Sequence, residues 1–225
     1  GDDGGSSGPS SRGGGLVVIH TATVSMKNPG WWRETLGGAW KPGTTKWREG
    51  KMDLYFTENQ FIDDTGHPIT KTASNFHFDD EIYYDMDVKP EVRVLATSYT
   101  PNVREGRKPA PGNVPHIYDI QPQMWVYEKT AEGGTAPYRA FVSIPGHKFA
   151  TFNRPNYRAI LLRGIAWAGK RANVDEFVKP EELSSLRYPE GGPMKPADTL
   201  ANLEIHPDFT MKLVVAEPLI TKPMN

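Results

Sequence analysis

The chain contains no cysteine among its 225 residues. This absence excludes disulfide bonds, zinc sites built on thiolates and a cysteine nucleophile. Long apolar runs are also missing, since no stretch approaches the roughly 18–20 residues that a membrane-spanning helix needs, and we expect no membrane span. The net charge is also small, because 26 basic residues nearly balance 27 acidic ones. Without a basic patch, we expect no nucleic-acid partner.

Three motifs of common enzyme classes are absent too. The sequence has no Gly-x-Ser-x-Gly elbow, no Gly-x-x-x-x-Gly-Lys-Ser/Thr phosphate loop and no Gly-x-Gly-x-x-Gly after a strand. The glycine run at 13–15 precedes an apolar segment, whereas a dinucleotide loop would follow one. Serine hydrolases, nucleotide hydrolases and nicotinamide dehydrogenases therefore lose support.

Two apolar runs each end on a histidine, at His20 after residues 14–19 and at His147 after residues 140–146. Runs without polar alternation are typical of strands buried on both faces of a parallel sheet. The ligand crevice of such sheets lies outside the carboxyl ends of the strands. We therefore expect both histidines in one site. The alternative is two ordinary loop histidines, each bonded to a backbone carbonyl.

A carboxylate partner is expected from the acidic run 79–81. The apolar segment 82–84 follows directly, which draws at least one carboxylate toward buried surface, and we select Glu81. Together with His20 and His147, it would serve in general acid–base catalysis or as a two-histidine, one-carboxylate ligand set for a divalent metal such as zinc. The alternative is a solvated acidic turn.

Aromatic residues supply candidates for substrate binding. Four tryptophans fall in one short stretch, at Trp31, Trp32, Trp40 and Trp47. They predict either a small satellite core or a flat wall on which a sugar ring could stack. We name Trp32 and Tyr83 as walls of the site. His67 precedes a proline, which favours a structural role in a turn, and it is the third substrate-binding candidate.

The periodicity and turn signals predict several elements. These are a short helix at 29–38, a strand at 79–86, a strand pair at 123–129 and 138–144, a surface loop that could act as a lid at 101–115, a long helix at 155–169 and a further strand within 206–217.

Five segments carry a family resemblance. In order, they are GGLVVIHTAT (14–23), WRETLGG (32–38), HPIT (67–70), DEIY (80–83) and SIPGH with the helix that follows it (143–168). Over about residues 13–171 the sequence resembles the ThuA-like, or trehalose-utilisation, family. The resemblance implies an α/β fold, a flavodoxin-like three-layer sandwich with a mostly parallel sheet related to class I glutamine amidotransferases. Amidotransferase chemistry is not expected without a cysteine.

The resemblance also implies a function. It indicates a domain that binds or acts on a sugar, either a trehalose-type disaccharide or its keto derivative, as a hydrolase or isomerase. His20, Glu81 and His147 would then carry proton transfer or metal ligation. The alternative is a non-catalytic carbohydrate-binding or interaction module of a larger oxidoreductase.

The expected organisation has four parts. Residues 1–13 are expected to be a disordered segment or a cloning remnant, 14–171 the ThuA-like domain without its N-terminal strands, and 172–202 a linker with a short helix. Residues 203–225 resemble the start of a propeller-type dehydrogenase domain found in planctomycete and verrucomicrobial proteins. We therefore expect a piece of a longer, exported polypeptide, with that dehydrogenase domain as a partner.

Overall fold

The structure is a computed structural model that describes residues 13–56, 66–101, 118–187 and 208–214. The chain divides into two compact units, Gly1–Pro189 and Glu190–Asn225. In the described part of the second unit, 208–214, all residues are exposed and none lies in a strand, so the strand expected within 206–217 is not found there. The expected surface loop at 101–115 and the expected segment 1–13 fall almost entirely outside the described residues, and so does 203–225 apart from residues 208–214.

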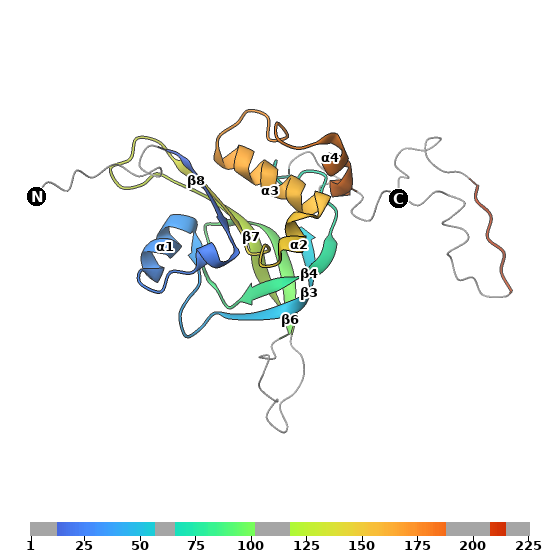
Figure 1. Ribbon diagram of the computed structural model, residues 1–225, viewed down its shortest axis with the longest axis horizontal. Helices are drawn as coiled ribbons and strands as arrows, with labels where there is room; N and C mark the ends of the chain where they lie inside the picture. The colour runs from blue at the N-terminus through green and yellow to red at the C-terminus, as the bar shows by residue number, and fades with distance from the viewer. Residues whose placement is uncertain (1–12, 57–65, 102–117, 188–207, 215–225) are drawn as a thin grey trace, which may run out of the picture. The chain divides into compact units, whose positions relative to one another are not determined.

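A six-stranded sheet forms the centre of the first unit (Figure 1). Its spatial order is β1 (Gly15–Ile19), β8 (Tyr138–Ser143), β7 (Tyr118–Lys129), β6 (Arg93–Pro101), β3 (Lys46–Phe56) and β4 (Phe76–Tyr84). A separate antiparallel pair joins β2 (Gly38–Ala39) to β5 (Asp87–Val88).

The α/β class is confirmed, but the expected predominance of parallel strands is wrong. Among the described strands only β1 and β8 pair in parallel, whereas all other pairs are antiparallel. Strands β7 and β8 are antiparallel because a short loop joins them directly, whereas a parallel pair would need a crossover connection. The strand pair predicted at 123–129 and 138–144 is this β7–β8 pair.

The helices predicted at 29–38 and 155–169 are present with nearly the same ends, and the structure adds two short helical segments at 20–23 and 149–152 that the sequence analysis did not predict. In chain order the helices are a 3-10 turn η1 (His20–Thr23), α1 (Pro29–Leu36), α2 (Phe149–Phe152), α3 (Pro155–Ala168) and α4 (Pro180–Arg187). Proline opens α1, α3 and α4, where a missing N–H costs nothing. Gly37 ends α1 with a φ of +74°, the left-handed conformation that glycine adopts without strain. No helix among the described residues is long and apolar enough to cross a bilayer.

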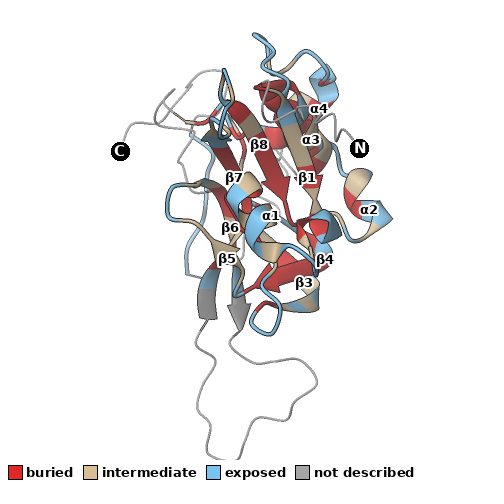
Figure 2. Ribbon diagram, turned by 90° about the vertical axis from the view of Figure 1, so that its left-hand side faces the viewer, coloured by how far each residue is buried: buried red, intermediate tan, exposed pale blue. Residues whose placement is uncertain are grey.

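The sheet has an apolar core on each face, and Figure 2 marks the buried residues of its strands in red. One core packs Phe78 and Ile82 of β4 against Tyr157 and Ile160 of α3. The other contains Leu36 of α1 together with Val18, Tyr83 and Trp125. Helices therefore cover both faces, which is the layered arrangement expected of an α/β domain.

Helix α4 belongs to the same unit, packed on α3 through an ion pair between Arg158 and Glu182. Burial of the Glu182 carboxylate opposes its ionisation, but the hydrogen bond from Arg158 and the backbone N–H of Lys179 outweigh burial and lower its pKa. The short helix expected within 172–202 is thus present and docked, and residues 188–207 lie outside the described part.

Candidate functional site

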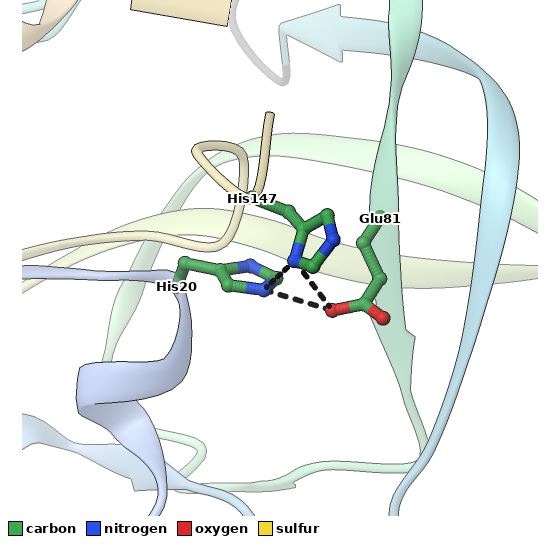
Figure 3. Close-up of side chains that lie close together, drawn as sticks. All are labelled: His20, Glu81 and His147. Carbon is green, nitrogen blue, oxygen red and sulfur yellow. Dashed lines mark hydrogen bonds and ion pairs between the residues drawn. The ribbon is translucent and has the colours of Figure 1, made fainter. Parts of the chain in front are cut away.

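His20 lies directly after β1, where the chain turns into η1. Its imidazole is buried, and its Nδ1 lies 2.8 Å from the carbonyl oxygen of Ile144, just beyond β8. Because a carbonyl can only accept a hydrogen bond, Nδ1 carries a proton. The other ring nitrogen, Nε2, points away from Ile144 toward Glu81 (Figure 3). The parallel pairing of β1 with β8 thus places the end of one strand against the end of the other.

His147 follows β8 on a tight loop. Gly146 before it has a φ of +130°, and a Cβ at this position would come within 2.6 Å of Ile19 Cγ2. Glycine is therefore required for the loop to approach β1 so closely. The His147 side chain is 42% exposed, so its ring faces the solvent side of the site.

Glu81 approaches from β4, on the far edge of the sheet order, and its side chain is buried. Its Oε2 lies 2.8 Å from Nε2 of His20 and 3.6 Å from Nδ1 of His147 (Figure 3). The two ring nitrogens lie 3.2 Å apart. The structure therefore brings together the three residues that the sequence predicts for one site.

These three atoms are all electron-rich. With the Nδ1 proton of His20 committed to Ile144, Nε2 of the neutral ring carries only a lone pair, and it faces a carboxylate oxygen at 2.8 Å. Two acceptors at this distance repel each other unless a positive charge lies between or upon them. The pair therefore needs either a proton, held by one of the two atoms, or a metal ion.

The spacing fits a small tetrahedral cation. Donor atoms at the 2.0–2.1 Å typical of zinc lie about 3.3 Å from each other in a tetrahedron, and the three separations found here are 2.8, 3.2 and 3.6 Å. His20, Glu81 and His147 are the cluster of potential metal ligands found among the described residues. Three protein ligands leave a fourth position open, the arrangement of catalytic zinc sites.

Tyr83 contacts the cluster through the ring of His20. Its hydroxyl lies 3.1 Å from Nε2 of His20, and the two rings pack at a centroid distance of 4.7 Å. Burial is the main cause that raises the pKa of Tyr83 to about 12. A hydrogen bond with Thr21 lowers this pKa, and the nearby charge of Glu81 raises it. The phenol therefore stays protonated at neutral pH, and its proton is available to an acceptor of the cluster such as the Glu81 carboxylate.

The sequence reasoning missed Glu49. In the β3–β4 register Glu49 lies directly opposite Glu81, and its Oε1 lies 3.8 Å from Nε2 of His147. Nε2, the outer nitrogen of His147 on the side away from Glu81, thus has a carboxylate nearby, as is common for metal-ligating histidines. Only the strand register reveals this neighbour, because 32 residues separate it from Glu81 along the chain.

The sequence reasoning also missed Asp80, the residue beside Glu81. Its fully buried carboxylate accepts hydrogen bonds from the backbone N–H groups of Gly146 at 3.0 Å and His147 at 2.9 Å, and from the hydroxyl of Thr151. Choosing one acidic residue of three discarded it, although a strand of alternating faces gives adjacent carboxylates different surroundings.

The proposed aromatic walls lie at different places. Trp32 stacks on Trp31 at 5.2 Å and donates its Nε1 proton to the carbonyl oxygen of Ala22. Trp40 packs edge-on against Tyr83 at 5.0 Å, so it adjoins the cluster through that ring. Trp47 is half exposed and lies opposite Tyr83 in the β3–β4 register.

His67 lies apart from the cluster. Its buried ring contacts Trp167 of α3 at 5.1 Å, and its Nδ1 accepts a hydrogen bond from the backbone N–H of Ile69. These contacts belong to the turn that begins at His67, where its carbonyl also accepts the N–H of Thr70. A substrate-binding role for His67 remains a prediction from sequence.

Fold and site together define an α/β protein with a polar centre at the carboxyl ends of its two parallel strands. Residues 10–168 match the family model described as "ThuA: Trehalose utilisation", and the chain belongs to this family. A crystal structure at 1.75 Å of a ThuA-like protein from Parabacteroides merdae ATCC 43184 is similar, with 20% identity and a TM-score of 0.50. The match covers 71% of this chain and 62% of that chain, and it supports the fold. No match was found among curated proteins.

Proposed function

We propose that this ThuA-family domain is a divalent-metal-dependent enzyme acting on a sugar, either a trehalose-type disaccharide or its keto derivative. His20, Glu81 and His147 would hold the metal. The single observation behind the metal is the convergence of three potential ligand atoms from three separate segments, all within 3.6 Å of one another. The family membership supports the sugar.

The reaction class that suits this site is hydrolysis or isomerisation beside a carbonyl. When bound, a metal ion of this kind polarises a carbonyl oxygen and lowers the pKa of bound water. His147 would hold the metal through Nδ1, so the half-exposed Glu49 carboxylate beside its outer nitrogen is the group that would exchange a proton with a substrate. Tyr83 and the Nδ1 contact to Ile144 hold the His20 ring in one orientation.

Half-exposed aromatic surface next to the cluster supports a sugar as substrate. Trp47 stands beside Glu49 on the same face of β3, because residues two apart share a face. Flat aromatic faces suit the apolar face of a pyranose ring. In this proposal Trp47 and Trp32 would form the walls, while the buried Tyr83 would act on the cluster itself.

The alternative is a non-catalytic carbohydrate-binding or interaction module of a larger oxidoreductase, joined through the tail at 203–225 to a dehydrogenase domain. In that case the cluster would bind a metal or a proton without turnover. The two functions are separated by whether the cluster residues are needed for product formation or only for binding.

The test is titration of the purified chain, stripped with a chelator, with Zn²⁺ in a calorimeter, followed by assay of the loaded protein on trehalose and on its keto derivatives. We expect one Zn²⁺ per chain. Loss of an outer-shell partner typically weakens metal binding about 10–100-fold. We expect a larger loss of Zn²⁺ affinity in each of the ligand variants His20→Ala, Glu81→Gln and His147→Ala. Turnover of a keto-disaccharide should vanish in all three variants.

Matched controls are available on β4. His77→Ala removes an exposed histidine and Asp79→Asn an exposed carboxylate of the same strand, so both variants should bind Zn²⁺ like the unaltered chain. A chain that binds no Zn²⁺, or that binds it equally well without His20 and Glu81, would contradict the metal centre. Full metal binding with sugar binding but no turnover would favour the module.

A further inference from the structure

Asp80 is a buried carboxylate held by neutral donors. Its Oδ1 accepts the backbone N–H of Glu81 at 2.7 Å and of His147 at 2.9 Å, with Lys148 N–H at 3.4 Å. Its Oδ2 accepts the N–H of Gly146 at 3.0 Å and the hydroxyl of Thr151. Among the described residues no cationic side chain forms an ion pair with Asp80. Burying a carboxylate without a counter-ion is costly, so this set of hydrogen bonds needs an explanation.

The two adjacent acids of β4 reach the same loop from opposite faces of the sheet. Phe78 and Ile82, which share the face of Asp80, pack in the core beneath α3. Tyr83, which shares the face of Glu81, packs in the core on the α1 side. His147 is therefore held at its backbone by Asp80 and met at its imidazole by Glu81.

The bonds that Asp80 makes outside its own strand are centred on the backbone around His147. Besides the N–H of Glu81 next to it on β4, its backbone donors are the three consecutive N–H groups of Gly146, His147 and Lys148, which all precede α2 at Phe149. Three successive N–H groups that point at one anion form a concave nest. A carboxylate that capped α2 would accept from the backbone N–H groups of its first turn, whereas Asp80 meets that turn through a side chain, the hydroxyl of Thr151.

We propose that Asp80 is the positioning residue that fixes His147 in the cluster with His20 and Glu81, an inference that rests on the proposed function. The His147 side chain is partly solvent-exposed, and a free loop would lose conformational entropy each time the ring joined His20 and Glu81. Asp80 removes this cost in advance by fixing the loop backbone. Ligand orientation through outer-shell hydrogen bonds is the general means by which proteins tune metal affinity.

Asp80→Asn tests this role, because the amide keeps the size of the side chain but places an NH₂ where an acceptor is needed. We expect Zn²⁺ affinity to fall about 10–100-fold. In a His147→Ala background, the same change should have less than about a twofold effect, since contacts that act through one residue are not additive. Asp79→Asn, the exposed neighbour, is the matched control and should leave affinity unchanged in both backgrounds.

A second measurement does not depend on the metal. In the metal-free chain, Asp80→Asn should lower the NMR order parameters of Gly146–Lys148 toward the flexible range, below about 0.6, and shift the imidazole resonances of His147 but not those of His77. If Asp80→Asn does not fold, Thr151→Val removes one donor while keeping the carboxylate, and it should give a smaller loss in the same direction.

The outcomes separate the two claims. If the unaltered chain binds no Zn²⁺, the proposed metal function fails, while the order parameters still report whether Asp80 holds the loop. If the chain binds Zn²⁺ through His20, Glu81 and His147 but Asp80→Asn binds it equally tightly, the positioning role is wrong. An affinity loss of the same size with and without His147 also overturns it, because Asp80 would then act on the fold as a whole.

Discussion

At the residue scale, His20 carries a backbone conformation that is unusual for its type. Its φ is +50°, in the left-handed region that residues with a Cβ avoid. The conformation turns the chain from β1 into η1 and aims the ring at Glu81, while Thr23 closes the turn by donating its hydroxyl to the His20 carbonyl. Strained backbone of this kind persists where the surroundings hold it, and it is concentrated at functional sites.

We expect His20→Gly to be more stable than His20→Ala by about 1 kcal/mol, because glycine adopts positive φ freely whereas alanine does not. Both variants lose the same imidazole and the contact to Ile144, so the difference isolates the backbone. Urea unfolding of the metal-free variants measures it. Equal midpoints and equal slopes for the two would show that residue 20 is not strained.

The placement of the site residues was predictable where it depended on strand ends and unpredictable where it depended on register. His20 and His147 each follow an apolar run, and the strand-end rule alone brings them together. Glu49 becomes a neighbour of His147 only through the β3–β4 register. Asp80 was hidden because nothing in the sequence tells which side of β4 faces the β8–α2 loop.

At the scale of elements, α3 lies unusually close to β8. A Cβ on Gly164 of α3 would come within 2.1 Å of the ring of Phe141 on β8. Glycine lowers helix propensity by about 1 kcal/mol relative to alanine, so its presence in the middle of a helix needs a packing reason. The close approach supplies it: helix backbone and aromatic ring are in direct contact, and the helix cannot move away without opening the core.

Gly164→Ala should therefore destabilise the fold by at least about 1 kcal/mol, because overpacking outweighs the gain in helix propensity. Gly30→Ala in α1 is the matched control: a Cβ there meets nothing within 4 Å, so this variant should be neutral or gain up to about 1 kcal/mol. Thermal unfolding monitored by circular dichroism compares the two. Stabilisation by both substitutions would show that the α3–β8 contact can relax.

Helices α1 and α3 were predictable because proline and glycine mark their ends, as at Pro155 and Gly37. The direction of the strands was not. Apolar runs without alternation mark strands buried on both faces, which is true of β8, but burial on both faces does not require parallel neighbours. Here β8 pairs in parallel with β1 on one side and antiparallel with β7 on the other.

At the scale of the whole molecule, the site joins segments from across the first unit. His20 and His147 are 127 residues apart in sequence, and Glu81 lies between them on the opposite edge strand. A ligand held by all three binds the native state and not the unfolded chain. Such a ligand stabilises the whole fold by mass action.

We expect Zn²⁺ at about 100 times its dissociation constant to add about 2.7 kcal/mol to the free energy of unfolding. For a domain of this size, that corresponds to a rise in Tm of about 5–10 °C. Removal of the metal with EDTA should reverse the rise, and His147→Ala should abolish it. Identical melting curves with and without saturating Zn²⁺ would contradict binding across the three segments.

The parallel partnership of β1 with β8 has a consequence for biosynthesis. Because β1 leaves the ribosome more than a hundred residues before its neighbour, a nascent chain carries His20 and Glu81 long before the loop that completes their surroundings exists. The centre is assembled only when the last strand of the sheet arrives. If the centre holds a metal ion as proposed, premature capture of that ion by an incomplete chain is disfavoured, and its uptake is tied to completion of the sheet.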